Sequence, residues 1–138
     1  MANALVTQGK VRMLGHATEG IDLINDTIKA VLVDHGVDTP VPATDIYLSD
    51  ITAGARVATS AALANKTTTG GVFDADDITL SLVTGASCES IVLYKDSGNP
   101  ATSPLIAVID TMTGLPVTPN GGDIILQWAN DANKIFAI

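Results

Sequence analysis

Three aspartates within four positions form the densest group of potential metal ligands in this chain. Asp74, Asp76 and Asp77 precede an apolar run that begins at Ile78. Carboxylates that converge from a short loop are the ligands that Ca²⁺ requires, so this triplet is a candidate calcium site. The spacing lacks the later bidentate acid and the mid-loop glycine of a helix–loop–helix calcium site. We therefore favour a turn whose aspartates accept backbone hydrogen bonds at the start of the strand, and we expect no metal and no cofactor.

The other reactive side chains are isolated from one another along the chain. Cys88 is the only cysteine, which excludes an internal disulfide, and the adjacent carboxylate of Glu89 should raise the pKa of its thiol. His16 and His35 lie beside glycine or aspartate, without a partner at catalytic or metal-ligand spacing. These patterns predict a packed thiol and two solvated or locally hydrogen-bonded imidazoles.

Motifs for nucleophilic catalysis, phosphate binding and sugar binding are missing as well. The motif Gly-x-Ser-x-Gly does not occur, and no glycine-containing stretch ends in the Gly-Lys-Ser/Thr of a phosphate loop. Tyr94 and Trp128 are rare large aromatics that fit a core or a strand face better than a sugar platform. We therefore expect a protein that is not an enzyme.

Composition narrows the classes of partner. The net charge is −8, and the seven basic residues are scattered singly, so neither nucleic acid nor an anionic membrane surface is an expected partner. No apolar run approaches the roughly 20 residues of a membrane span, and the first residues do not resemble a signal peptide, so we expect a cytosolic product. Only 16 % of the residues are charged, which indicates that other chains cover part of the surface.

The elements that must position these residues are mostly strands. The stretch 72–109 contains three apolar runs bounded by Gly, Pro, Asn, Asp or Ser, which predicts three strands paired through two turns. We expect strands over 27–33, 78–83, 90–95, 104–109 and 123–128, and a strand or irregular edge over 55–64. We also expect a short helix or arm over 4–14, a short helix over 44–51, and a last strand or packed tail over 134–138.

The predicted fold class is mainly β. One domain of antiparallel strands, arranged as a β-sandwich or a barrel-like domain with one or two short helices, would span 21–138, and 1–20 would form an N-terminal arm or short helix. A length of 138 residues suits one domain of ordinary size, and a core of Val, Ile, Leu and Ala suits sheet packing.

Seven motifs, spread from about Ile21 to the end, resemble those of a widespread family of small virion structural proteins of tailed bacteriophages. They are Asn25-Asp26-Thr27-Ile28-Lys29, Leu32-Val33-Asp34, Leu48-Ser49-Asp50-Ile51, Phe73-Asp74-Ala75-Asp76-Asp77-Ile78-Thr79, Val92-Leu93-Tyr94-Lys95-Asp96, Ser103-Pro104-Leu105-Ile106 and Gly114-Leu115-Pro116-Val117-Thr118-Pro119-Asn120-Gly121-Gly122. The motifs are structural rather than catalytic. The resemblance therefore implies a virion component, either on the capsid surface or in the neck and tail, and it supplies no binding residues.

The resemblance leads to two hypotheses about function. In the first, the chain is a capsid decoration or cement protein, a homo-oligomer and specifically a trimer, that binds the major capsid protein on the outer surface of the shell. In the second, it is a neck, tail or fibre-associated module that binds other virion proteins or the host surface. Under either hypothesis the apolar residues near the two ends are the candidate partner-binding residues: Leu5, Val11, Leu14, Ile135, Phe136 and Ile138.

Overall fold

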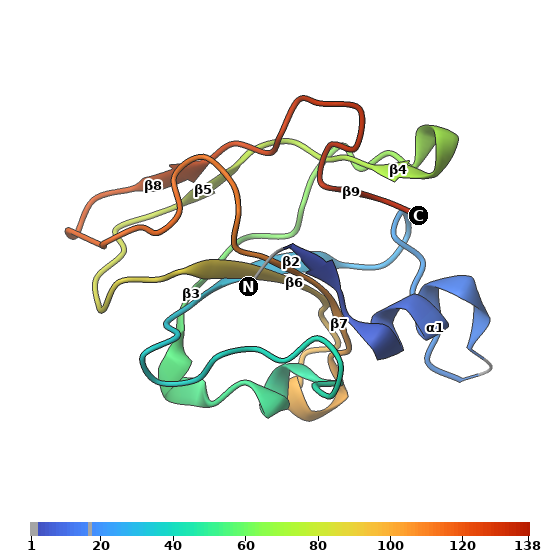
Figure 1. Cartoon of the computed structure of the whole chain (residues 1–138), viewed down its shortest axis with the longest axis horizontal. Helices are drawn as coiled ribbons and strands as arrows, with labels where there is room; N and C mark the ends of the chain where they lie inside the picture. The colour runs from blue at the N-terminus through green and yellow to red at the C-terminus, as the bar shows by residue number, and fades with distance from the viewer. Residues whose placement is uncertain (1–2, 17) are drawn as a thin grey trace.

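The computed structural model describes residues 3–16 and 18–138, and a five-stranded antiparallel sheet runs through its middle (Figure 1). The expectation of a mainly β, antiparallel fold is confirmed, with a single α-helix in the described part of the chain. In spatial order the strands of the sheet are β1 (Ala4–Leu5), β7 (Leu105–Ile109), β6 (Ser90–Lys95), β2 (Ile28–Val33) and β3 (Arg56–Thr59).

The three central strands are buried on both faces. Almost every residue of β2, β6 and β7 is inaccessible to solvent, which explains why their sequences are continuous apolar runs rather than alternating ones. Side chains on one face pack under the C-terminal half of the chain, and side chains on the other face pack against segment 34–55. The sheet is therefore the middle layer of the molecule.

Two short ribbons form the layer above the sheet in Figure 1. Strand β4 (Val72–Phe73) pairs with β9 (Phe136–Ala137), and β5 (Ile78–Leu80) pairs with β8 (Ile124–Leu126), both antiparallel. In β5 and β8 the outer residues of each strand are buried and the middle one is exposed, as expected for a ribbon with one face on a core. The expected strands at 123–128 and 134–138 are thus confirmed in shorter form.

The expected hairpin between 78–83 and 90–95 is wrong. Strand β5 ends at Leu80, and the chain turns away through Leu82, which has φ +50° and whose N–H donates to Asp123 Oδ1 at 3.0 Å. The pairing partner of β5 is consequently β8, while β6 pairs with β2 and β7. The physical reason is burial. β5 has an exposed middle residue and therefore fits the covering layer, whereas β6 is apolar on both faces and fits only the interior.

The segment around 44–51 contains less helix than expected. It contains one 3₁₀ turn, η1 (Leu48–Asp50), and the Asp50 carboxylate accepts hydrogen bonds from the N–H groups of Ile46 and Tyr47. Three further 3₁₀ turns occur: η2 (Ala53–Ala55), η3 (Thr69–Gly71) and η4 (Pro100–Thr102). No helix in residues 3–16 and 18–138 is long and apolar enough to cross a membrane.

The N-terminal residues are part of the fold. Within the expected arm or helix of 1–20, β1 forms the edge of the sheet beside β7, and α1 (Thr7–Gly15) packs on β7; Met1, Ala2 and Ala17 lie outside the described residues. Helix α1 approaches β7 closely at Gly9, because a Cβ at this position would lie 2.5 Å from the carbonyl oxygen of Leu105. A glycine inside the predicted helix therefore reflects tertiary packing and not a helix break.

Candidate functional site

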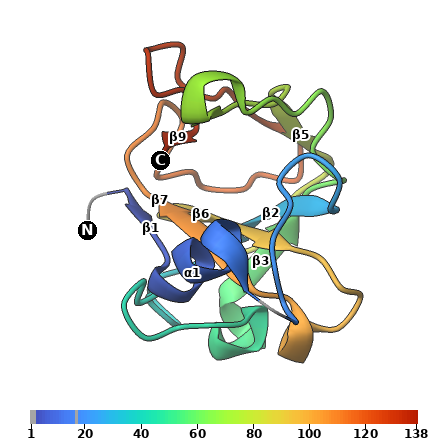
Figure 2. The same ribbon diagram turned by 90° about the vertical axis from the view of Figure 1, so that its right-hand side faces the viewer.

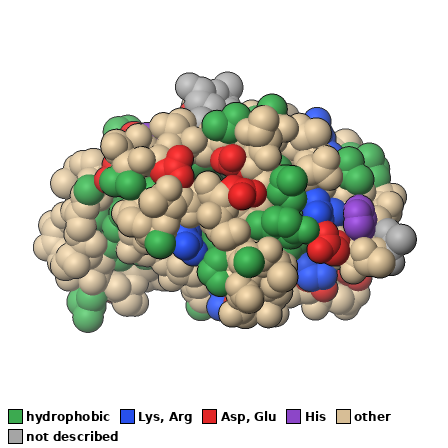
Figure 3. Space-filling model, turned by 90° about the horizontal axis from the view of Figure 1, so that it is seen from below, with side chains coloured by type: hydrophobic (Ala, Val, Ile, Leu, Met, Phe, Trp, Pro, Cys, Tyr) green, Lys and Arg blue, Asp and Glu red, His purple; other side chains and the backbone are tan. Residues whose placement is uncertain are grey.

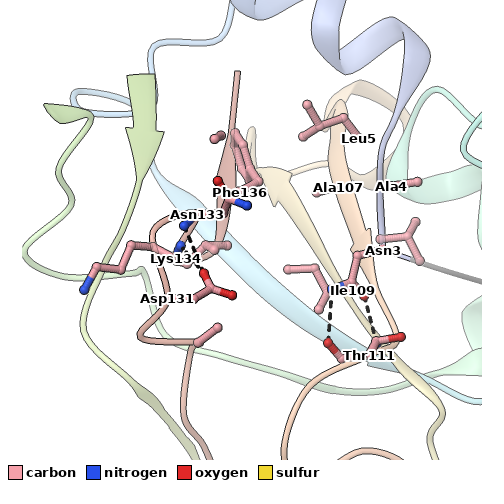
Figure 4. A pocket seen from close by; sticks show the side chains of 14 residues that line it. Asn3, Ala4, Leu5, Ala107, Ile109, Thr111, Asp131, Asn133, Lys134 and Phe136 are labelled. Carbon is pink, nitrogen blue, oxygen red and sulfur yellow. Dashed lines mark hydrogen bonds between the residues drawn. The ribbon is translucent and has the colours of Figure 1, made fainter. Parts of the chain in front are cut away.

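A hollow on the described surface lies between segments near the two ends of the chain. It has a volume of about 440 Å³ and separates β1 and the end of β7 from the C-terminal segment 129–137 (Figure 4). Figure 2 shows β1 and β9 on the same side of the molecule, β9 above and β1 below. We refer to this hollow as the terminal groove.

Asn3 holds the N-terminal wall of the terminal groove in place. Its Oδ1 accepts hydrogen bonds from the N–H groups of Asp110 and Thr111, both at 2.8 Å, and its Nδ2 donates to the Thr111 carbonyl at 3.0 Å. The side chain of this one asparagine thereby hydrogen-bonds three backbone groups of the segment that follows β7. Leu5, two residues further on, packs its side chain against the core under the ribbons.

The C-terminal wall is a turn followed by β9. Asp131 Oδ1 accepts from the N–H groups of Asn133 at 2.9 Å and Lys134 at 3.1 Å, and Lys134 adopts φ +48°. Phe136 then packs on Phe73 of β4 with ring centroids 5.2 Å apart. The wall is thus held by a capped turn at one end and by an aromatic pair at the other.

A second, smaller hollow lies beside β9 and is mostly apolar. It has a volume of about 260 Å³, and its lining residues are Leu23, Thr68, Gly71, Phe73, Phe136 and Ile138. Phe136 contributes to both hollows, so β9 separates them.

The structure brings together some of the candidate partner-binding residues and separates the others. Leu5, Ile135 and Phe136 line the terminal groove, and Ile138 lines the second hollow. Ile135 is itself a core residue, so its main role is packing. Val11 and Leu14 line neither hollow.

Three of these candidates are open to solvent. Leu14 is 77 % exposed, Ile138 is 64 % exposed, and Val11 is 44 % exposed. Solvent exposure of this size leaves them free to contact another chain.

The aspartates of the candidate calcium site have separate partners. Asp76 Oδ2 accepts from Asn65 Nδ2 at 2.6 Å, and Asp77 Oδ1 accepts from the Trp128 N–H at 2.9 Å, whereas Asp74 forms a backbone bridge with Thr67. In the part of the chain that the structure describes, no group of three His, Cys, Asp or Glu residues is placed to hold a metal ion. The expected turn therefore ties distant segments together instead of capping its own strand.

The isolated reactive residues have structural surroundings. Cys88 is fully buried, and burial, with Asp34 and Glu89 nearby, raises the pKa of its thiol to about 11, as expected from its neighbours. His16 Nδ1 accepts from the Glu19 N–H at 3.1 Å. Tyr94 and Trp128 are buried core residues, as the sequence indicates.

Sequence reasoning missed a serine–histidine contact. His35 Nε2 and Ser90 Oγ share a hydrogen bond at 2.8 Å, although 55 residues separate them. Ser90 lies in β6 and is fully buried, so no substrate can reach its hydroxyl in this fold. The contact therefore anchors the turn after β2 to the sheet.

A second cluster was also missed, and it positions α1. Arg12, which is 5 % exposed, contacts Glu19 Oε2 at 2.6 Å, and Tyr47 OH donates to the same carboxylate oxygen at 2.8 Å. The hydrogen bond from Arg12, and then that from Tyr47, lowers the pKa of Glu19, and the carboxylate raises the pKa of Tyr47. This cluster ties α1 to the loop after it and to the segment that covers the lower face of the sheet.

No protein-family model and no curated protein matches this chain. The class of this protein is therefore described by its fold and its surface alone. It is a mainly β domain with a mixed polar and apolar groove between its two ends.

Proposed function

We propose that this chain is a virion structural protein of a tailed bacteriophage, a capsid decoration or cement protein that binds the outer surface of the major capsid shell as a trimer. The observation that carries the proposal is the meeting of residues 3–5 and 129–137 at the terminal groove. A decoration protein needs a compact, rigid domain and one surface for other chains, and the two structured ends supply such a surface.

Exposed apolar residues near the same ends support the proposal. Leu14 on α1 and Ile138 after β9 are both largely exposed, although nonpolar side chains of this size gain free energy when they are buried. Figure 3, which views the molecule from the side of segment 34–55, shows that apolar side chains also occur on this face, and the exposed Val37 and Val41 belong to this segment.

Charge supports an outer position in the particle. A net charge of −8 disfavours contact with packaged DNA, because binding to phosphates requires clustered Lys and Arg. The ion pairs of Lys29 with Asp96 at 2.7 Å and of Lys95 with Asp26 at 3.0 Å, like that of Arg12 with Glu19, use basic side chains within the domain.

The test measures binding to capsid shells of the phage whose genome encodes the chain. Shells without decoration are incubated with purified protein and sedimented, and bound copies are counted per particle. Decoration predicts hundreds of copies, whereas a neck, tail or fibre-associated module predicts a few to dozens on complete virions and none on bare shells. The second outcome would replace the decoration hypothesis.

Matched variants test whether exposed apolar residues outside the terminal groove add to binding. Leu14→Ser together with Ile138→Ser should weaken shell binding, while Ile125→Ser, an equally exposed apolar residue on β8, should leave binding unchanged. Shell binding that is unaffected by the double variant, or lost equally in the control, contradicts the proposed surface.

A further inference from the structure

Among residues 3–16 and 18–138, two strand edges without a neighbouring strand line the terminal groove. The five-stranded sheet ends at β1, and the ribbon of β4 and β9 ends at β9, and both β1 and β9 line the groove. Edge strands expose backbone N–H and C=O groups that can pair with another strand. The groove therefore has hydrogen-bonding backbone on both walls.

The registers identify the backbone groups that point away from their own sheets. Ala4 pairs with Val108, and the Val6 N–H donates to the Ile106 carbonyl at 2.8 Å, so the N–H and C=O of Leu5 are directed away from β7. On the other wall, the Ile138 N–H donates to the Gly71 carbonyl at 2.9 Å, so the N–H and C=O of Ala137 are directed away from β4.

The direction of the two walls is compatible with one inserted strand. In Figure 4 the chain rises from Asn3 to Leu5 on one wall and from Lys134 to Phe136 on the other. A strand that is antiparallel to one wall is then antiparallel to both. It would join the five-stranded sheet to the β4–β9 ribbon.

The charge of the groove indicates which kind of segment fits. Asp131 lines the groove, and its Oδ1 accepts two backbone hydrogen bonds. Lys134, the other charged lining residue, extends away from the groove (Figure 4). With a net charge of −8 for the whole chain, complementarity favours a basic side chain on the occupant.

We propose that the terminal groove binds an extended segment of a partner protein as an added strand between β1 and β9, with a Lys or Arg of that segment beside Asp131. Main-chain hydrogen bonds then provide the attraction, and the alternating side chains of the segment select the partner. This inference rests on the proposed function, because it specifies how a capsid or other virion protein engages the chain.

The first test uses a synthetic extended peptide of alternating valine and threonine with one central lysine. Nuclear magnetic resonance titration should show saturable binding, and the amides of Leu5 and Ala137 should become protected from hydrogen exchange on binding. The same peptide with N-methylated amides on alternate residues, or with glutamate in place of lysine, should bind about tenfold more weakly or not at all. Equal binding of the N-methylated peptide overturns the proposal, and so does protection of both amides in the free chain.

Proline variants test the two walls separately. Leu5→Pro and Ala137→Pro each remove one N–H that faces the groove, and proline is tolerated on edge strands where the N–H has no partner in its own sheet. Each should weaken peptide binding about tenfold, whereas Leu5→Val and Ala137→Ser, which keep the N–H, should weaken it less than the proline variants do. Thermal unfolding of all four variants identifies any that fail to fold, and a loss of binding in the Val and Ser variants as large as in the proline variants contradicts strand addition.

Two further measurements separate this inference from the proposed function. Sedimentation of the free chain that shows self-association with protection of Leu5 and Ala137 would mean that the occupant is a second copy, which overturns the partner segment. Shell binding that persists in Leu5→Pro and Ala137→Pro, with no peptide binding, would refute strand addition and leave the decoration role intact. Peptide binding without shell binding would refute the decoration role alone.

Discussion

At Gly9, where α1 approaches β7 closely, helix propensity and packing predict opposite effects of an alanine substitution on the stability of the chain. Considered as an isolated helix, α1 should be stabilised by Gly9→Ala by about 1 kcal/mol, because alanine has the higher helix propensity. In the folded chain the added Cβ would lie 2.5 Å from the Leu105 carbonyl oxygen and 3.1 Å from the Ile106 Cα. Both contacts are with backbone, so no side-chain rotation can relieve them.

The packing effect should exceed the propensity effect. The shorter contact falls about 1 Å short of the ~3.5 Å at which nonbonded atoms attract each other, so α1 or β7 must move. Overpacking of this kind costs about 1–3 kcal/mol. We expect Gly9→Ala to lower the free energy of unfolding by about 2 kcal/mol, which for 138 residues corresponds to a fall in Tm of roughly 6 °C.

The assay is urea unfolding followed by the fluorescence of Trp128, the single and buried tryptophan. The matched control is Gly54→Ala, where the nearest atom, Val37 Cγ1, would lie at an ordinary 3.9 Å from the new Cβ. This control should be unchanged or stabilised by about 0.4–1 kcal/mol, because alanine restricts the unfolded chain. A Gly9→Ala variant as stable as the original chain, at the same denaturant dependence, would refute the packing of α1 on β7.

Three other predictions concern separate parts of the molecule. On β8, Leu126→Ala should lower the free energy of unfolding by about 2–5 kcal/mol, because Leu126 is in the core. Ile125→Thr should change it by at most about 0.5 kcal/mol, because Ile125 is exposed. Equal urea midpoints for the two variants would contradict the register of the ribbon. Arg12 lowers the pKa of Glu19 in the folded chain, so the stabilisation from Glu19 is complete above its ordinary pKa of 4.5 and is lost as the pH falls through the lower folded value. The original chain should therefore lose stability in acid more steeply than Glu19→Gln. Parallel pH profiles of the urea midpoint would argue against this contact. Cys88, buried and with a pKa of about 11, should react with an aromatic disulfide reagent only after unfolding in urea, and rapid reaction of the native chain would show that the thiol is accessible.

The strands that were predicted well share one property. β2, β6 and β7 are uninterrupted apolar runs ended by turn residues, and the structure buries them on both faces. Such a pattern is local, so a reader of the sequence can locate the strands without knowing what packs on them. The loop that joins the paired strands β6 and β7, residues 96–104, is equally predictable because its Asp, Ser, Gly, Asn and Pro residues favour turns.

The features that were missed, namely strand β1 and the pairing of β5 with β8, depend on distant partners. β1 is a strand only because β7 lies beside it, and β5 pairs with β8 from more than 40 residues further along the chain. The groove between the ends follows from these pairings, so its walls were recognisable as apolar ends but not as a site. Asp77 shows the same limit, because it looked like the cap of its own strand and instead accepts from the Trp128 N–H.

The sequence by itself determined the class of the fold, the positions of its central strands and the unreactive surroundings of Cys88. Each of these depends on composition, on local periodicity or on a neighbouring charge. Only the tertiary structure decided which strands pair, where α1 lies, and that Leu5 and Phe136 border one groove. The physical reason is that sheet partners and grooves are set by burial and hydrogen bonding between residues far apart in the chain, and a short stretch of sequence does not encode which distant strand supplies the missing backbone partners.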